Sequence, residues 1–70
     1  MARTQYSLSA QDRLDISMVQ VGGETVASLV RLKGHYEGLG KRLGKEYDRE
    51  IVRIMVRAIG DELKRRGIKL

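Results

Sequence analysis

The chain has no cysteine and only one histidine, His35. Disulfides are therefore excluded, and so is a structural zinc site, which needs several Cys or His ligands. The sequence also has no complete catalytic or cofactor motif, so we expect neither an enzyme nor a bound cofactor or metal. A chain of 70 residues buries only about 60% of its unfolded surface, and small domains compensate with disulfides, metals or oligomerisation. The composition thus predicts self-association, at least as a dimer.

Long hydrophobic runs and targeting signals are also absent. The longest apolar stretch, residues 51–59, is interrupted by Arg53 and Arg57 and falls far short of the roughly 20 residues of a membrane span. No apolar segment follows the first residues, as a secretory leader would require, and Ala2 stands where myristoylation needs glycine. We therefore expect a soluble cytoplasmic protein without a membrane partner.

Positive charge is concentrated in the second part of the chain. The net charge is +5, but residues 1–30 hold two bases against three acids, whereas residues 31–70 hold twelve bases against six acids. A positive field attracts polyanions such as nucleic acid, an anionic membrane or an acidic protein. The alternative is that the charge only serves solubility. DNA is the expected partner, and an acidic protein is the alternative one.

The N-terminal third predicts a strand and then a helix. Tyr6 and Leu8 alternate with polar neighbours, which is typical of a strand over residues 3–9, and a disordered tail is the alternative. Ser9 is a good N-cap for a helix over residues 10–21. The branched residues that alternate near the end of this segment would also suit a strand. We favour the helix because the cap is well placed.

The rest of the chain predicts two further helices in a single domain of residues 1–70. Gly22-Gly23 ends the first helix, and a second is expected over residues 24–37, followed by a basic, glycine-rich connector over residues 38–45. The last helix is expected over residues 46–66, because its apolar residues recur at helical spacing. Its apolar sector is wide enough to predict dimerisation. The expected dimer interface comprises Tyr6, Leu8, Ile51, Ile54, Met55, Ala58, Ile59 and Leu63.

Two basic patterns in this part of the chain have competing interpretations. Arg49, Arg53 and Arg57 are four residues apart and form a stripe on the last helix. The stripe is either a solvated face paired with nearby acids, a phosphate- or acid-binding surface, or a membrane-surface helix. A phosphate-binding loop around Lys41 is excluded, because the glycine spacing is one residue too long and Arg42 replaces the required Ser or Thr.

The order of these elements resembles the ribbon-helix-helix family of the Arc, MetJ and CopG type, including TraY-like plasmid proteins. The residues that carry the resemblance are 3–9 for the ribbon, the Ser9 cap, the Gly22-Gly23 turn, and residues 25–33 for the second helix. In that family two chains pair their ribbons, and the outward ribbon side chains enter the major groove of DNA. A second register places the ribbon at residues 16–21 and the two helices at residues 24–40 and 48–66.

The resemblance implies a mainly α fold, with a short N-terminal strand, two or three helices, a long C-terminal helix and a dimeric state. It assigns base contacts to Arg3, Gln5 and Ser7, and a phosphate to the helix N-terminus at Gly23, Glu24 and Thr25. The charge pattern adds further expected DNA contacts, namely Arg31, Lys41, Arg42 and Lys45.

Three classes of function are therefore expected, in decreasing order. The first is a small DNA-binding protein, a dimeric transcriptional regulator or a plasmid or phage accessory factor. The second is a small helical interaction protein, such as a phage-type inhibitor or adaptor, that binds a protein partner. The third is a structural subunit of a larger assembly.

Overall fold

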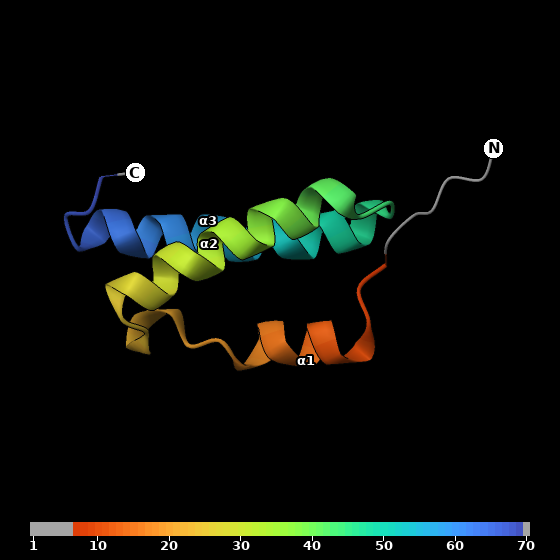
Figure 1. Cartoon of the computed structure of the whole chain (residues 1–70), viewed down its shortest axis with the longest axis horizontal. Coiled ribbons are helices and arrows are strands. Elements are labelled where there is room, and N and C mark those ends of the chain that lie inside the picture. Colours follow the sequence, from red (N-terminus) through yellow and green to blue (C-terminus); the bar gives the residue numbers. More distant parts are fainter. Residues whose placement is uncertain (1–6, 70) are drawn as a thin grey trace.

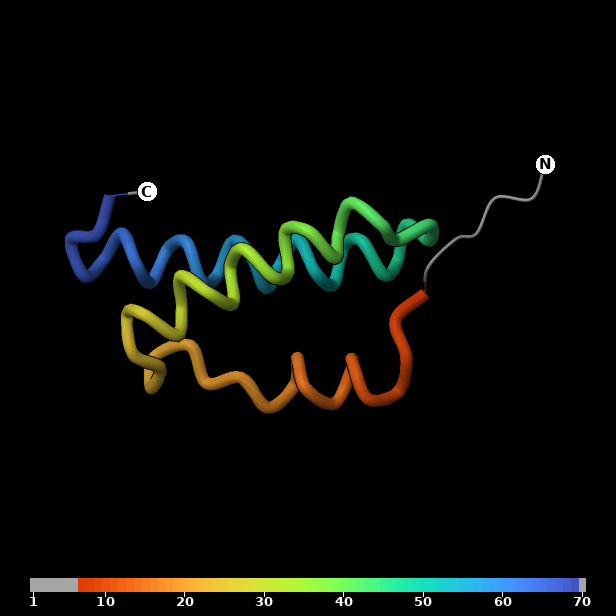
Figure 2. The backbone as a smooth tube through the Cα atoms, in the orientation of Figure 1, coloured from red at the N-terminus to blue at the C-terminus, as the bar shows by residue number. Residues whose placement is uncertain are grey.

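The computed structural model describes residues 7–69, and this part of the chain is helical. It contains the helices α1 (Ala10–Met18), α2 (Val26–Arg42) and α3 (Glu46–Arg65), with a short 3₁₀ turn, η1 (Val21–Gly23), between α1 and α2 (Figure 1). The helices α2 and α3 pack against each other as an antiparallel hairpin. The helix α1 runs alongside this hairpin in the direction of α3 (Figure 2).

Side chains and backbone bonds at the helix ends explain where the helices begin and stop. The Ser9 hydroxyl accepts the Asp12 N–H (3.0 Å), while the Asp12 carboxylate accepts the Ser9 N–H (3.2 Å), which is a capping box for α1. At the start of α2, the Thr25 hydroxyl accepts the Ser28 N–H (3.1 Å), which is a single N-cap bond. After α3, Gly67 has a φ of 84°, and the N–H of Ile68 bonds the carbonyl of Leu63 (2.9 Å). This arrangement is a Schellman stop, which favours glycine because of the positive φ.

The core lies between α2 and α3. Leu29 on α2 is fully buried, as are Ile59 and Leu63 on α3. The other buried apolar residues are Leu8, Tyr36, Leu39, Leu43 and Val52. The helix α1 contains no buried residue, and Ile16 is its member that packs partly against the core. The hairpin therefore carries most of the apolar burial, and α1 is an addition to it.

The predicted N-terminal strand is wrong, because residues 7–69 contain no strand. Residues 3–6 of the expected strand lie outside the described residues. Ser7 to Ser9 lack regular secondary structure, and the Leu8 N–H donates to the buried Asp48 carboxylate (3.3 Å). The alternative ribbon at residues 16–21 is also wrong, since it falls on the end of α1 and the start of η1. The ribbon-helix-helix-like architecture is therefore replaced by a helix packed beside a helical hairpin.

The expected connector over residues 38–45 is mostly helical, because α2 continues to Arg42. Leu39 and Leu43 are buried, and burying a leucine stabilises a fold by about 1.5–3 kcal/mol, whereas a glycine in a helix costs about 1 kcal/mol. Gly40 also allows close packing, since a Cβ there would lie 3.4 Å from Cγ1 of Val52. Burial against α3 thus outweighs the helix-breaking tendency of the glycines. The first helix differs too, since it ends at Met18 and not at residue 21.

The hairpin core predicts a sharp contrast between a buried isoleucine on α3 and an exposed leucine on α1. Ile59→Ala removes a fully buried side chain and should lower the free energy of unfolding by about 2–5 kcal/mol. Leu14→Ala, at a position of α1 that is 51% exposed, should change it by less than about 0.5 kcal/mol. Urea unfolding followed by circular dichroism measures both values. Equal losses in the two variants would contradict the assigned core.

Candidate nucleic-acid interface

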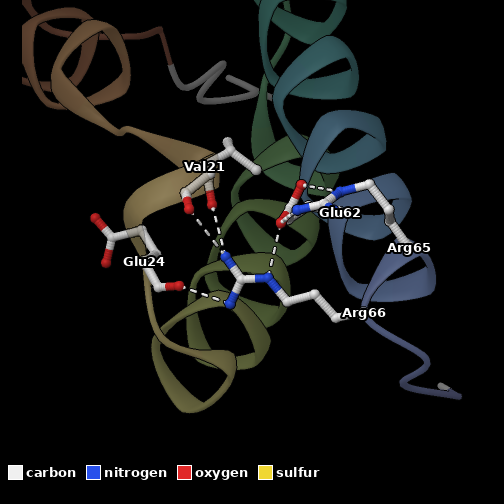
Figure 3. Close-up of polar contacts among 6 residues, drawn as sticks. Val21, Glu24, Glu62, Arg65 and Arg66 are labelled. Atoms are coloured by element: carbon white, nitrogen blue, oxygen red, sulfur yellow. Dashed lines mark hydrogen bonds and ion pairs between the residues drawn. The ribbon is translucent and has the colours of Figure 1, made fainter.

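Arg66, the residue that follows α3, donates hydrogen bonds from Nε, Nη1 and Nη2 to other groups of the same chain. Its Nε donates to Glu62 Oε2 (2.7 Å), and its Nη1 donates to the Glu24 carbonyl (2.8 Å). Its Nη2 reaches the carbonyls of Gly22 (3.2 Å) and Val21 (3.5 Å). Figure 3 shows the guanidinium lying between α3 and the η1 turn. Arg66 therefore ties the α1–α2 connection to the end of α3.

Glu62 is the anion that orients this arginine. Its carboxylate also accepts two bonds from Arg65, from Nη2 (2.5 Å) and from Nε (3.1 Å), as Figure 3 shows. The bonds from Arg65 and then Arg66 lower the pKa of Glu62 from its ordinary 4.5 to about 2, because they favour the charged carboxylate. Arg65 and Arg66 are thus both partnered by one acid.

At the other end of the molecule, a second set of polar contacts joins α3 to the segment around the start of α1. The Asp48 carboxylate on α3 is 1% exposed and accepts the Leu8 N–H and a bond from Arg13 Nη2, each at 3.3 Å. The Arg13 guanidinium also lies over the Tyr47 ring, 6.0 Å from its centroid. Since a buried carboxylate needs such partners, Asp48 positions the segment that leads into α1. Arg13 is therefore occupied in the same structural role.

The first part of the arginine stripe on α3 is neutralised by neighbouring acids. Arg49 pairs with Glu46 (2.8 Å), and Arg53 pairs with Glu50 and, at 4.0 Å, with Glu46. The Arg49 bond lowers the pKa of Glu46, which keeps this carboxylate charged. Arg57, in contrast, makes no hydrogen bond or ion pair with another described residue. The uncompensated charge of the stripe thus lies toward the C-terminal half of α3.

This charge continues into a hollow lined by lysines. The hollow has a volume of about 480 Å³ and is formed by Lys33 of α2 with Gly60, Lys64, Ile68 and Lys69 of α3 and its C-terminal extension. The Lys33 side chain lies across from Gly60, since a Cβ at position 60 would be in van der Waals contact with Cε of Lys33, at 3.6 Å. Lys33 is held by Glu37 (2.7 Å), whereas the side chains of Lys64 and Lys69 form no ion pair with another described residue.

Helical spacing places the arginines beside this lysine hollow. Gly60 and Lys64 follow Arg57 by three and seven residues, and Arg57 follows Arg53 by four, so these positions lie on one side of α3. Together they form what we call the basic face, made of Lys33, Arg53, Arg57, Lys64 and Lys69. The basic face is a cationic surface that the chain's own acids only partly neutralise.

The residues expected to bind DNA do not come together in one site. Arg3 and Gln5 lie outside the described residues. The exposed residues among the others include Ser7, Arg31, Lys41, Arg42 and Lys45; Arg31, Lys41 and Arg42 belong to α2, and Lys45 is the N-cap residue of α3. Thr25 lies at the opposite end of α2 from Arg42, about 26 Å along the axis.

The expected phosphate site at the start of α2 is already occupied by protein groups. The Thr25 hydroxyl accepts the Ser28 N–H (3.1 Å), and the Glu24 carboxylate accepts the Ser28 hydroxyl (2.8 Å). Gly23 is exposed in η1 beside this carboxylate-bearing residue. Because a phosphate here would meet a carboxylate, the helix N-terminus favours anion binding less than the basic face does.

Sequence reasoning missed Lys33, Lys64 and Lys69. The seven-residue spacing from Arg57 to Lys64 was a signal that could have extended the stripe. The position of Lys33 beside Gly60 depends on how α2 packs against α3, and Lys69 reaches the hollow only because the chain turns at Gly67.

The residues expected at a dimer interface divide into three groups. Tyr6 lies outside the described residues. Leu8, Ile59 and Leu63 are buried in the core of the chain itself, and Ile51 and Met55 are partly buried against it. Ile54 and Ala58 remain exposed on α3. Most of the expected interface is thus used within one chain, because the hairpin needs the same apolar sector.

A second hollow, of about 440 Å³, lies between α1 and α2 and contains polar groups. Its lining includes Asp15, Ser28, His35 and Tyr36. Ser28 and His35 are seven residues apart on α2, about 10.5 Å along the axis, which is too far for a hydroxyl–imidazole relay. Burial, followed by the nearby Asp15 and Asp12 charges, raises the pKa of Tyr36. This hollow therefore contains no serine–histidine pair, and its Ser28 hydroxyl donates to the Glu24 carboxylate.

Two features are absent from residues 7–69: a cluster of metal-ligating side chains and a membrane-spanning helix. No group of three or more His, Cys, Asp or Glu side chains is arranged to hold a metal ion within residues 7–69. None of the helices described for these residues is both long and apolar enough to cross a membrane.

The depressed pKa of Glu62 predicts a specific pH dependence. Glu62 should stabilise the fold fully above about pH 4.5, its unfolded value, and this contribution should be lost as pH falls toward about 2. Glu62→Gln lacks the charge at every pH, so wild type should exceed it in stability at pH 6 and converge with it near pH 2. Urea midpoints at both pH values measure the difference, and a gap that stays constant would contradict the assignment.

Comparison with known proteins adds no relative: no protein-family model, no curated protein and no solved structure matches the chain.

Proposed function

We propose that the protein binds DNA through the basic face, which contacts the phosphate backbone. The observation that carries this proposal is the lysine hollow: three lysines from α2, α3 and the C-terminal turn surround one opening, in line with Arg53 and Arg57. Lysine binds phosphate as a point charge, and an arginine fork adds directed hydrogen bonds. An open cationic surface of this kind suits the backbone of a polyanion.

The distribution of partnered charges supports the same proposal. Arg13, Arg65 and Arg66 are held by Asp48 or Glu62 and so contribute to folding. Arg57, Lys64 and Lys69 have no such role among the described contacts. Neutralising phosphates with such side chains releases condensed counterions, which supplies binding free energy without sequence recognition. The proposal is therefore backbone binding, with no base contact assigned.

Two acidic residues of the first third line a different region. Asp15 and Glu24 border the hollow between α1 and α2, whereas Lys64 and Lys69 border the hollow between α2 and α3. The carboxylates of Asp15 and Glu24 are thus not on the basic face. This separation of charge favours one orientation of the protein on DNA, with the hairpin toward the duplex and α1 away from it.

Two charge reversals of the same type test this proposal. Arg57→Glu places an acid on the basic face, and Arg31→Glu makes the same change at an exposed position on α2 outside it. Affinity for a random duplex, measured by fluorescence anisotropy at 50 and 200 mM salt, should fall about tenfold in Arg57→Glu. Its log–log salt slope should decrease by about 1, because one phosphate contact is lost.

The Arg31→Glu control should stay within about threefold of wild type, since only the general charge changes. Circular dichroism confirms that both variants remain helical. Binding that does not depend on salt, or equal losses in the two variants, would contradict the proposal.

A further inference from the structure

One side of α3 carries a row of residues that the chain itself covers only in part: Ile51 packs partly against the core, and Arg13 lies over the Tyr47 ring. The row consists of Tyr47, Ile51, Ile54, Ala58, Asp61 and Arg65, which we call the α3 seam. Tyr47 and Ile54 are 68% and 60% exposed, and Ala58 is also exposed. The spacing of the seam is four, three, four, three and four residues, at which apolar positions align between two supercoiled helices. The seam therefore has the periodicity of a helix–helix interface, with four apolar or aromatic residues followed by two charged ones.

We propose that a second copy of this chain covers the α3 seam, with the two α3 helices antiparallel. The relative direction of the two α3 helices follows from the two charged residues at the C-terminal end of the seam. In a parallel pair, Asp61 would face Asp61 and Arg65 would face Arg65, and like charges placed opposite each other repel. An antiparallel pair separates these like charges along the helix axis.

The antiparallel arrangement also matches the seam residues by size and chemistry. Centred on residue 56, it places Ile54 opposite Ala58, which pairs a large side chain with a small one. It places Arg65 opposite Tyr47, where a guanidinium over an aromatic ring is attractive. The remaining pair sets Ile51 opposite Asp61, so the acidic residue lies beyond the central Ile54 and Ala58. The two pairs Ile54–Ala58 and Arg65–Tyr47 are thus complementary, and each occurs twice in a two-fold interface.

This inference goes beyond DNA binding and does not depend on it, but it has a consequence for the basic face. Arg53, Arg57 and Lys64 each precede a seam residue by one position, which is a rotation of about 100° around α3. The two-fold axis of the pair is perpendicular to the plane that contains both helices. A side chain that lies above this plane in one chain therefore lies above it in the other chain as well. Both arginine stripes therefore lie on one surface of the dimer, and the two lysine hollows adjoin that surface.

The oligomeric state of the full chain without DNA tests the interface. Sedimentation equilibrium should show a dimer for wild type and a monomer for Ile54→Glu, which places a charge at the centre of the seam. Val30→Glu is the matched control: Val30 is 43% exposed on α2, outside the seam, so this variant should remain dimeric. Monomeric wild type, a dimeric Ile54→Glu variant, or loss of the dimer in Val30→Glu would each overturn the proposal.

Cysteine cross-linking tests the direction, because the chain has no native cysteine. Tyr47→Cys and Arg65→Cys are introduced separately, and the chains are oxidised alone and as a mixture. The antiparallel pair brings position 47 of one chain opposite position 65 of the other, so the mixed disulfide should form. Identical positions would be about 27 Å apart along the axis, so each variant alone should not cross-link. A disulfide within either variant alone, or no mixed disulfide, would overturn the antiparallel arrangement.

Discussion

The packing of α2 against α3 is the constraint on which the rest of the structure depends. Leu29, Ile59 and Leu63 are fully buried between these helices, and they meet because the chain reverses tightly between Arg42 and Glu46. Apolar burial of this kind is the main favourable term in folding. The helix α1 adds no buried side chain of its own, so its position depends on the hairpin being formed. The same packing also creates the lysine hollow.

Two polar ties attach the N-terminal third to the hairpin, one at each end. Asp48 holds the segment before α1 through Leu8 and Arg13, and Arg66 holds the η1 turn through three backbone carbonyls. Each tie joins segments more than 30 residues apart in the chain with a charged group. Hydrogen bonds to charged groups contribute more than neutral ones, and they specify direction. A segment with little apolar surface is thereby positioned without a core of its own.

These ties also explain which basic side chains are left for the DNA binding that we propose. The sequence shows an excess of bases after residue 30. It does not show that Arg66 and Arg13 form their hydrogen bonds and ion pairs within the chain itself. The stripe of Arg49, Arg53 and Arg57 is visible from spacing alone, and so are the acids that pair with its first two members. Sequence reasoning, however, assigned the binding role to Arg31, Lys41, Arg42 and Lys45, and it did not include Lys64. The position of Lys33 across from Gly60 needed the hairpin, because the two residues are 27 positions apart.

The sequence by itself determined the features that depend on local interactions. The Ser9 cap, the extent of the last helix and the stop at Gly67 follow from side chains and backbone preferences within a few residues. Only the tertiary structure decided the contested segments. Leu39 and Leu43 extended α2 through the expected connector, because burial against α3 outweighs the cost of two glycines.

The tertiary structure likewise decided how the alternating N-terminal residues are used. Leu8 is buried and bonded to a carboxylate 40 residues away, an interaction that local alternation does not encode. It also divided the apolar sector of α3 between the core and the seam. The sequence shows how wide that sector is, but which part faces α2 depends on the shape of the neighbouring helix, and this is a property of packing between distant residues.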